Sequence, residues 1–164
     1  MILNSKLYRG GIGMAGEFGH IRISGLEAPC HCGKIGCLET VSSGRAIEKV
    51  AGKPLQEIIE AARKDDISAI DLLHRAGEKL GEGIATMVHL FNPDMVVIGG
   101  EIVQAGDLML VPVQQAINKY ALARMRGHCE LKMSNLGVYS AILGTLMMVM
   151  EHLYDDSECG YSLY

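Results

Sequence analysis

The most regular hydrophobic pattern of the chain lies between Asp65 and Phe91. Apolar residues recur there at spacings of three and four, as in a helix with one buried face: Ile67, Ile70, Leu73, Leu80, Ile84, Met87, Val88 and Phe91. Asp65 or Asp66 suits the N-cap, and Pro93 follows the end, so the sequence predicts a long helix to Leu90 or Phe91. Three glycines lower its intrinsic propensity and are expected to mark close packing against another element: Gly77, Gly81 and Gly83.

Shorter helices and strands are predicted on either side of this helix. The expected helices cover residues 45–50, 54–63, 108–122 and 140–154. The expected strands lie within residues 1–8, with a turn at Asn4-Ser5, and at 21–23, 95–98 and 129–133. The run at 95–98 is apolar throughout and ends in Gly99-Gly100, which is typical of a buried parallel strand followed by a tight turn. Helices that alternate with short strands predict an α/β lobe.

Local signals define the ends and buried faces of these elements. Ser42 or Ser43 is expected to cap the helix at 45–50, and Pro54 suits the first position of the next helix. The methionine-rich run at 147–150 is expected to pack in the core. The helix at 108–122 is expected to bury one face, made of Val113, Ala116, Ile117 and Tyr120.

Composition and charge narrow the classes of protein. The 164 residues are 49% hydrophobic and 21% charged, as in one globular domain or one lobe of a larger protein. The net charge is −4 and Lys and Arg are not clustered, which disfavours nucleic-acid binding by this chain itself. No apolar run could span a bilayer and the N-terminus lacks a signal pattern, so we expect no membrane contact and a cytoplasmic location.

Metal-binding residue types cluster between residues 20 and 37. A Cys3His ligand set with short loops is typical of zinc sites. Four protein ligands leave no open coordination position, so the metal would be structural. Gly33 and Gly36 permit the sharp turns that this set needs. His31 is out of register and is expected to face solvent, and Cys129 and Cys159 are expected to be free thiols. The four candidate ligands are His20, Cys30, Cys32 and Cys37; the alternative is a chance group of cysteines.

The segment before the cluster, residues 9–20, is rich in glycine, which lets backbone approach a ligand closely. It lacks a Gly-Lys-Ser/Thr ending and a long preceding strand, so a substrate-binding loop or a plain turn is favoured over a phosphate loop. Histidines elsewhere have no partner pattern and are interpreted as surface or core residues: His74, His89, His128 and His152.

Two motifs together resemble the ROK family, which comprises repressors, open reading frames and sugar kinases. The first reads Gly13-Met-Ala-Gly16-Glu17-Phe-Gly19-His20, followed by Cys30-x-Cys32-Gly-x-x-Gly-Cys37-x-Glu39. The second reads Leu90-Phe-Asn-Pro-Asp-Met-Val-Val-Ile-Gly99-Gly100. The spacing of the first fits the family's zinc motif without a gap, and the resemblance covers nearly the whole chain.

The resemblance implies an actin-like, ribonuclease H-like α/β fold with an inserted Cys3His zinc loop. Residues 1–154 would form the C-terminal, sugar-binding lobe, without its first strand and without the N-terminal lobe; residues 155–164 would be a frayed polar tail. The family's phosphate loop and catalytic aspartate would lie upstream, so we expect no catalytic residue here and no sugar phosphorylation by this chain alone.

The resemblance also implies roles for individual residues. Glu17, His20 and Glu39 would bind sugar hydroxyls, with one ring nitrogen of His20 on zinc and the other toward the sugar. Gly99 and Gly100 would lie beside a nucleotide. Each has a simpler alternative: Glu17 is a solvated turn residue, Glu39 stabilises a helix N-terminus, and the glycines only end a strand.

Two functions remain open within the family. The first is a regulator similar to the xylose and N-acetylglucosamine repressors, which binds DNA through a region absent from this chain and responds to a sugar or sugar derivative. The second is a glucokinase-like or fructokinase-like sugar kinase, which alone would need ATP and Mg²⁺. The regulator is favoured, partly because Tyr139 would crowd a nucleotide pocket. Both imply a homo-oligomer. A third interpretation, a free-standing zinc module that binds nucleic acid or protein, is disfavoured by the acidic charge.

Overall fold

The computed structural model describes residues 1–154, so the predicted polar tail lies outside the described part. The helices are α1 (Glu39–Ser42), α2 (Gly44–Ala51), α3 (Leu55–Arg63), α4 (Ile67–Phe91), α5 (Asp107–Tyr120) and α6 (Ser140–Tyr154). The strands are β1 (Ile2–Leu3), β2 (Lys6–Leu7), β3 (Met95–Ile98) and β4 (Glu130–Met133). Short 3-10 turns cover Phe18–His20, Glu101–Ala105, Ala123–Met125 and Gly137–Tyr139.

Most predicted elements are confirmed, with three local corrections. The strand expected at 21–23 is only an isolated bridge between Arg22 and Cys37. Pro54 is the N-cap of α3 rather than its first residue. The short helix α1, directly after the cysteine cluster, was not predicted. The hydroxyl of Ser43 accepts a hydrogen bond from the Ala46 N–H and so caps α2 as expected.

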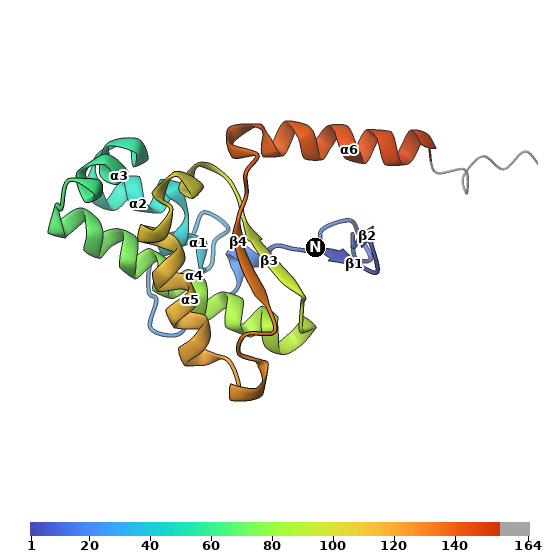
Figure 1. Ribbon diagram of the computed structural model, residues 1–164, viewed down its shortest axis with the longest axis horizontal. Coiled ribbons are helices and arrows are strands. Elements are labelled where there is room, and N and C mark those ends of the chain that lie inside the picture. Colours follow the sequence, from blue (N-terminus) through green and yellow to red (C-terminus); the bar gives the residue numbers. More distant parts are fainter. Residues whose placement is uncertain (155–164) are drawn as a thin grey trace, which may run out of the picture.

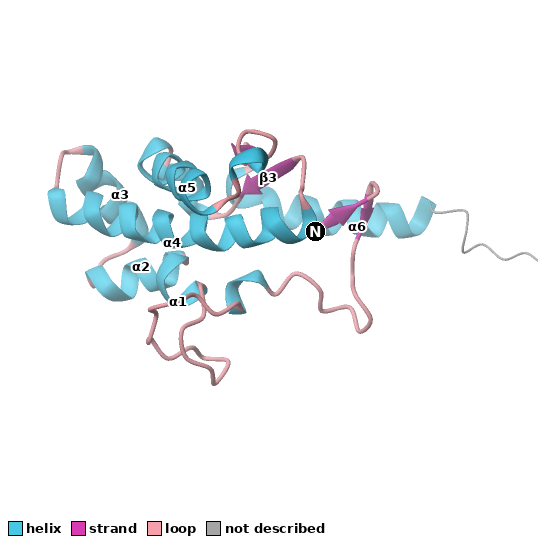
Figure 2. Cartoon of the chain, turned by 90° about the horizontal axis from the view of Figure 1, so that it is seen from below, coloured by secondary structure: helices cyan, strands magenta, loops and turns pink. Residues whose placement is uncertain are grey.

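Helix α4 is the centre of the molecule. In Figure 2 it runs between α5 and β3 on one side and α1 and α2 on the other. Its N-terminus is fixed by the Asp66 carboxylate, which accepts a hydrogen bond from the Ala69 N–H at 3.0 Å. The apolar face predicted from its sequence contributes Leu73, Ile84 and Val88 to the core. The prediction is wrong at the two ends of the helix, where Ile67 and Phe91 are exposed. This helix therefore positions both the cysteine loop and the small sheet.

The three glycines of α4 mark close packing, as the sequence predicts. A methyl group at Gly77 would lie 2.8 Å from the Pro112 ring of α5, and one at Gly81 would lie 2.6 Å from the methyl of Ala116. On the opposite side of α4, a methyl group at Gly83 would lie 2.8 Å from Leu38, next to the cysteine loop. Glycine therefore sets the distance from α4 to its neighbours on both sides.

Strands β3 and β4 pair in parallel, with Met95 opposite Glu130 and Ile98 opposite Met133. The prediction of a buried strand at 95–98 is wrong, because Met95 and Val97 are exposed and only Ile98 is buried. A two-stranded sheet covered by helices on one face leaves its other face open in the described chain. Parallel strands usually have both faces covered.

Helix α6 differs most from its prediction. Figure 1 shows it projecting from the body of the molecule, and the β1–β2 hairpin also lies apart from the helices. Met147, Met148 and Met150 are exposed, so the expectation that this run packs in the core is wrong for the described chain. Tyr120 of α5 is likewise exposed, although the other three residues of its predicted face are buried. None of the described helices combines the length and the apolar character that crossing a membrane would need.

Candidate functional site

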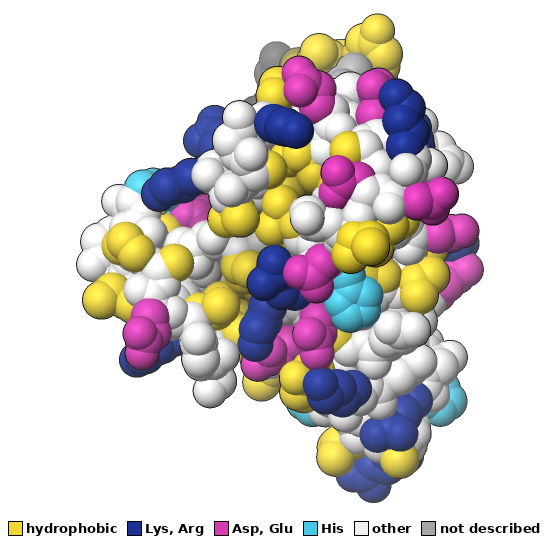
Figure 3. All heavy atoms as spheres, turned by 90° about the vertical axis from the view of Figure 1, so that its left-hand side faces the viewer, with side chains coloured by type: hydrophobic (Ala, Val, Ile, Leu, Met, Phe, Trp, Pro, Cys, Tyr) yellow, Lys and Arg dark blue, Asp and Glu magenta, His cyan; other side chains and the backbone are white. Residues whose placement is uncertain are grey.

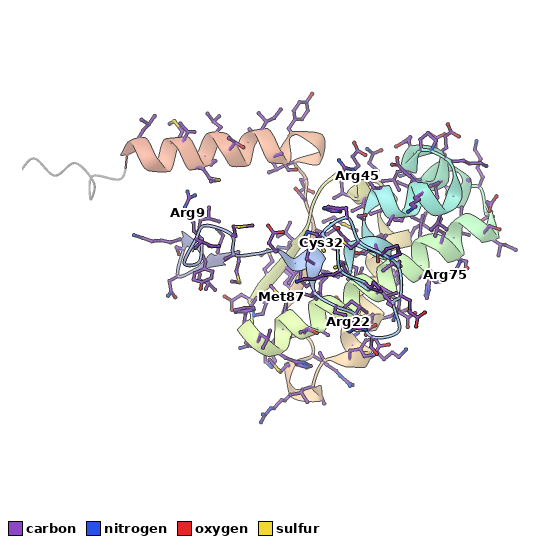
Figure 4. All side chains as sticks on the ribbon, turned by 180° about the vertical axis from the view of Figure 1, so that it is seen from behind. Arg9, Arg22, Cys32, Arg45, Arg75 and Met87 are labelled. Carbon is purple, nitrogen blue, oxygen red and sulfur yellow. The ribbon has the colours of Figure 1, made fainter. Side chains whose placement is uncertain are left out.

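The cysteines lie on a loop that is folded by its own backbone hydrogen bonds. The Ile23 N–H donates to the Gly36 carbonyl at 3.0 Å, the Leu38 N–H to the Ile21 carbonyl at 2.9 Å, and the Cys30 N–H to the Lys34 carbonyl at 2.8 Å. Gly36 has a φ of 81°, and a side chain there would collide with the Leu26 carbonyl. In Figure 4, Cys32 lies in this loop within the body of the molecule, whereas Arg9 lies apart beside the hairpin.

The four predicted ligands converge, and their geometry fits zinc. One ligand atom from each of the four lies within 4.8 Å of the others. The Sγ atoms of Cys32 and Cys37 are 3.6 Å apart, and Cys30 Sγ is 3.6 Å from His20 Nδ1. A tetrahedral site with Zn–S of about 2.3 Å and Zn–N of about 2.0 Å has S–S edges of about 3.8 Å and S–N edges of about 3.5 Å. The cluster could therefore hold a metal with little rearrangement.

The three thiols have different environments. A hydrogen bond to the Glu39 carboxylate, at 2.8 Å, raises the pKa of Cys30 to about 12. The Lys34 backbone N–H lowers the pKa of Cys32 by hydrogen bonding to its thiolate. Loss of hydration raises the pKa of the buried Cys37 thiol. Cys32, the exposed one of the three, is therefore the thiol whose environment favours the thiolate.

The carboxylates expected to bind sugar lie on either side of His20. Glu17 Oε2 is 3.7 Å from His20 Nε2, and Glu39 Oε1 is 3.5 Å from His20 Nδ1. Nδ1 therefore faces the thiols and Glu39, while Nε2 faces Glu17. Glu17 lies in the glycine-rich segment, directly before the 3-10 turn Phe18–His20, and Glu39 begins α1. Two distant segments thus contribute to one polar wall.

His31 takes part in this wall, which the sequence did not predict. Its side chain is 77% exposed, but its Nδ1 lies 2.9 Å from Glu39 Oε1. His20, His31 and Glu39 also lie close enough to share a metal. The three-cysteine set is the better zinc site, because thiolates bind zinc well and the second set would use the same His20 nitrogen. The only sequence signal for His31 was its position between two ligands.

A cleft of about 1140 Å³ extends from Glu39 and His31 to the Gly99-Gly100 turn, where a nucleotide was predicted. Its lining includes Glu39 and His31 from one segment and Gly99 and Gly100 from the end of β3. Two basic residues of α2, Arg45 and Lys49, also line it and were missed by the sequence analysis. The cleft lining does not include Glu17, His20 or Tyr139, so Tyr139 does not crowd the cleft in the described chain.

The remaining histidines agree with a structural or surface interpretation where they are described. His89 Nε2 accepts a hydrogen bond from the Leu122 N–H at 3.1 Å and so ties α4 to the end of α5. His74 and His128 are exposed. The side chain of His152 is outside the part of the chain that the structure describes. On the face shown in Figure 3, acidic and basic side chains are interspersed among hydrophobic ones.

The α/β fold is shared with part of solved sugar kinases and of a transcriptional regulator. A ROK glucokinase from Streptomyces griseus, solved in complex with glucose and AMPPNP, matches with a TM-score of 0.82 and 29% identity over 90% of this chain and 55% of that one. A ROK transcriptional regulator, described as a homologue of the Escherichia coli MLC protein, matches with a TM-score of 0.71 and 34% identity over 80% of this chain and 37% of that one. The family model described as "ROK family" matches residues 1–152, and the chain belongs to this family.

Relatives by sequence fall into the same two classes. The DNA-binding transcriptional dual regulator NagC of E. coli is 36% identical over 87% of this chain and 39% of its own length. A glucokinase of Halalkalibacterium halodurans is 33% identical over 88% of this chain and 50% of its own. The chain thus spans about half or less of the curated relatives that it matches. These relatives include both regulators and kinases.

Proposed function

We propose that this chain is the sugar-binding, zinc-braced C-terminal part of a ROK transcriptional regulator. The observation that carries the proposal is the position of His20 between Glu17 and Glu39, with Nδ1 beside the thiols and Nε2 beside Glu17. Carboxylates accept hydrogen bonds from neighbouring sugar hydroxyls, and both carboxylates here lie within reach of one imidazole. Glu17, His20 and Glu39 are therefore the proposed sugar-binding residues.

The proposed metal is a structural zinc held by His20, Cys30, Cys32 and Cys37. Zinc would fix the tautomer and the orientation of the His20 ring, because a metal on Nδ1 leaves the proton on Nε2. That Nε2–H can then donate to a sugar oxygen or to Glu17. The loop before α1 would also be held in place, and with it Glu39.

Two observations agree with a regulator, although the relatives also include a glucokinase. The relatives include NagC at 36% identity and a xylose repressor of Caldicellulosiruptor bescii that is 31% identical over 96% of this chain. The chain also carries a net charge of −4, which agrees with DNA contact through another region. A sugar that binds one conformation better than the other would shift the DNA-binding equilibrium. We further propose a cytoplasmic homo-oligomer.

The second candidate is the C-terminal lobe of an ATP-dependent sugar kinase, and the cleft favours it. Glu39 and the Gly99-Gly100 turn line the same space of about 1140 Å³, and Gly100 has a φ of 84°, a conformation that disfavours any residue with a side chain at this position. A nucleotide at the turn would lie in this cleft, and a sugar bound at Glu39 would reach it from the side of Glu39. In that case the γ-phosphoryl of ATP, with Mg²⁺, would pass in line to a sugar hydroxyl, and the general base would come from outside this chain.

Calorimetry on the protein at its natural length tests the sugar site. The protein is titrated with a panel of hexoses, pentoses and their phosphorylated or N-acetylated derivatives, and we expect at least one of them to bind. Glu17→Gln and Glu39→Gln should each weaken it by about tenfold or more, because a hydrogen bond to a charged group is lost. Glu57→Gln, on the exposed face of α3, is the control and should bind as the wild type does. Equal affinities for all variants would refute the assigned site.

Two assays on the same protein separate regulator from kinase. A regulator should bind operator DNA, and its affinity for DNA should change when the sugar identified by calorimetry is added. It should not consume ATP. A kinase should release ADP in the presence of a hexose. Turnover of ATP with the sugar that binds would overturn the regulator assignment but would leave the sugar site intact.

A further inference from the structure

One carboxylate oxygen of Glu39 lies close to three side chains of the loop from His20 to Leu38. Glu39 Oε1 lies 2.8 Å from Cys30 Sγ, 2.9 Å from His31 Nδ1 and 3.5 Å from His20 Nδ1. All three contacts fall on Oε1. The other oxygen, Oε2, faces Gly19, where a methyl group would lie 3.5 Å from it. Glu39 therefore has one crowded oxygen and one beside a residue without a side chain.

Metal binding would remove two of these three partners. A cysteine that binds zinc is a thiolate and has no proton to donate. An imidazole nitrogen that binds zinc uses the lone pair and carries no hydrogen. With Cys30 and His20 Nδ1 on the metal, neither can donate to Glu39. A thiolate at this distance would instead repel the carboxylate.

We propose that His31 is a positioning residue for the ligand site, whose Nδ1–H donates to Glu39 Oε1 when the metal is bound. Of the three neighbours, it alone keeps a proton for this oxygen. The hydrogen bond would hold Oε1 in place and so fix the orientation of the carboxylate, leaving Oε2 as the acceptor for a ligand hydroxyl. Neutral imidazole suffices, because its Nδ1–H tautomer is a donor.

The position of His31 suits this role. It sits between Cys30 and Cys32, so two metal–sulfur bonds would fix the backbone on both sides of it. Its side chain lines the same cleft as Glu39. Because the side chain is 77% exposed, truncating it removes the contact without opening a cavity in the core. The effect on the ligand rests on the proposed sugar site, but the hydrogen bond itself does not.

Nitrogen NMR of the zinc-loaded protein at its natural length tests the hydrogen bond directly. We expect the His31 ring as the Nδ1–H tautomer, with an Nδ1 resonance that moves in Glu39→Gln and stays in place in Glu57→Gln. An Nε2–H tautomer, or a resonance indifferent to Glu39→Gln, would overturn the proposal. This readout needs no sugar, so it decides the proposal even if the wild type binds none.

Calorimetry with the sugar that the wild type binds tests the consequence. His31→Ala should weaken binding by about tenfold, as is usual when a residue that orients a ligand group is removed. His31→Asn keeps an N–H donor and should recover part of the loss. His128→Ala is the matched control. Zinc content should stay the same in all three variants. Wild-type affinity in His31→Ala would overturn the proposal, and failure of the wild type to bind any sugar would refute the proposed function instead.

Discussion

Helices α4 and α5 and the loop from His20 to Leu38 hold their backbones in place by different means. The helices share a core of fully buried side chains such as Leu73, Met109 and Val113. The loop buries Ile23 and Leu38, and its remaining buried side chains are Cys30 and Cys37. The first region is stabilised by removal of apolar surface from water. The second has backbone hydrogen bonds and a set of donors that would bind a metal.

This difference means that the two regions should respond to different changes. A cavity in the helical core lowers the free energy of unfolding of the whole chain, because the core is shared by every helix from α2 to α5. Loss of a ligand should act on the loop and on the residues it positions, His20 and Glu39. The predictions below separate these responses, in order of decreasing effect.

The largest effect is expected from removal of a metal ligand. Cys37→Ser should abolish stoichiometric zinc, and the loop should lose several kcal/mol of protection against opening, since structural zinc sites contribute on the order of 10 kcal/mol in small peptides. Metal analysis and amide hydrogen exchange measure both. Cys129→Ser, a cysteine outside the cluster, should keep zinc and loop protection. Unchanged exchange at Ile23 and Leu38 in Cys37→Ser would show that the loop does not depend on metal.

The second effect is a cavity between α4 and its neighbours. Leu73→Ala should lower the free energy of unfolding by about 2–5 kcal/mol, because Leu73 is fully buried. Chemical denaturation measures it. Ile67→Ala on the first turn of the same helix is the control, since Ile67 is 82% exposed, and it should stay within about 0.5 kcal/mol of wild type. Similar losses in both variants would contradict the assigned core.

The third effect is a steric conflict where α4 meets α5. Gly81→Ala should destabilise by about 1–3 kcal/mol, because the added methyl meets the Val113 carbonyl and the Ala116 methyl. Gly144→Ala in α6 is the matched control. Apart from its chain neighbours and the backbone of its own helix, no atom of the described chain lies within 4 Å of the place its methyl would take, so better helix propensity should make it neutral or stabilising. Thermal unfolding of the two variants compares them directly.

The smallest effect concerns the surface pair Glu78–Lys119, with Nζ 3.1 Å from Oε1. The hydrogen bond from Lys119 lowers the pKa of Glu78 below its ordinary value of 4.5. A depressed carboxyl pKa stabilises the folded chain above the ordinary value, and the contribution is lost as the pH falls through the folded value. Glu78→Gln should lower Tm by at most about 2 °C near neutral pH, and the difference should vanish in acid. In a Lys119→Met background, the effect of Glu78→Gln near neutral pH should be clearly smaller, because the largest cause of the lowered pKa is then absent.

The sequence alone determined the features that depend on local spacing. The ends of α4 follow from Asp66 and Pro93, and its buried face follows from the three- and four-residue repeat. The four zinc-type donors lie close together, as their short separations and the glycines between them predicted. These features are local because the atoms concerned are connected by short stretches of backbone.

Only the tertiary structure decided which distant groups meet and which surfaces stay open. Gly99 and Gly100 share a cleft with Glu39 because α1 packs against α4 and β3 lies on the other side of that helix (Figure 2), a relation that spacing along the chain cannot give. The contact of His31 with Glu39 depends on side-chain direction in a turning loop. The apolar residues of α6 read as core residues in sequence, but burial requires a partner surface, and in the described chain that helix projects away from the others. A hydrophobic pattern gives the side of a helix that can be buried, and the packing of distant segments decides whether it is.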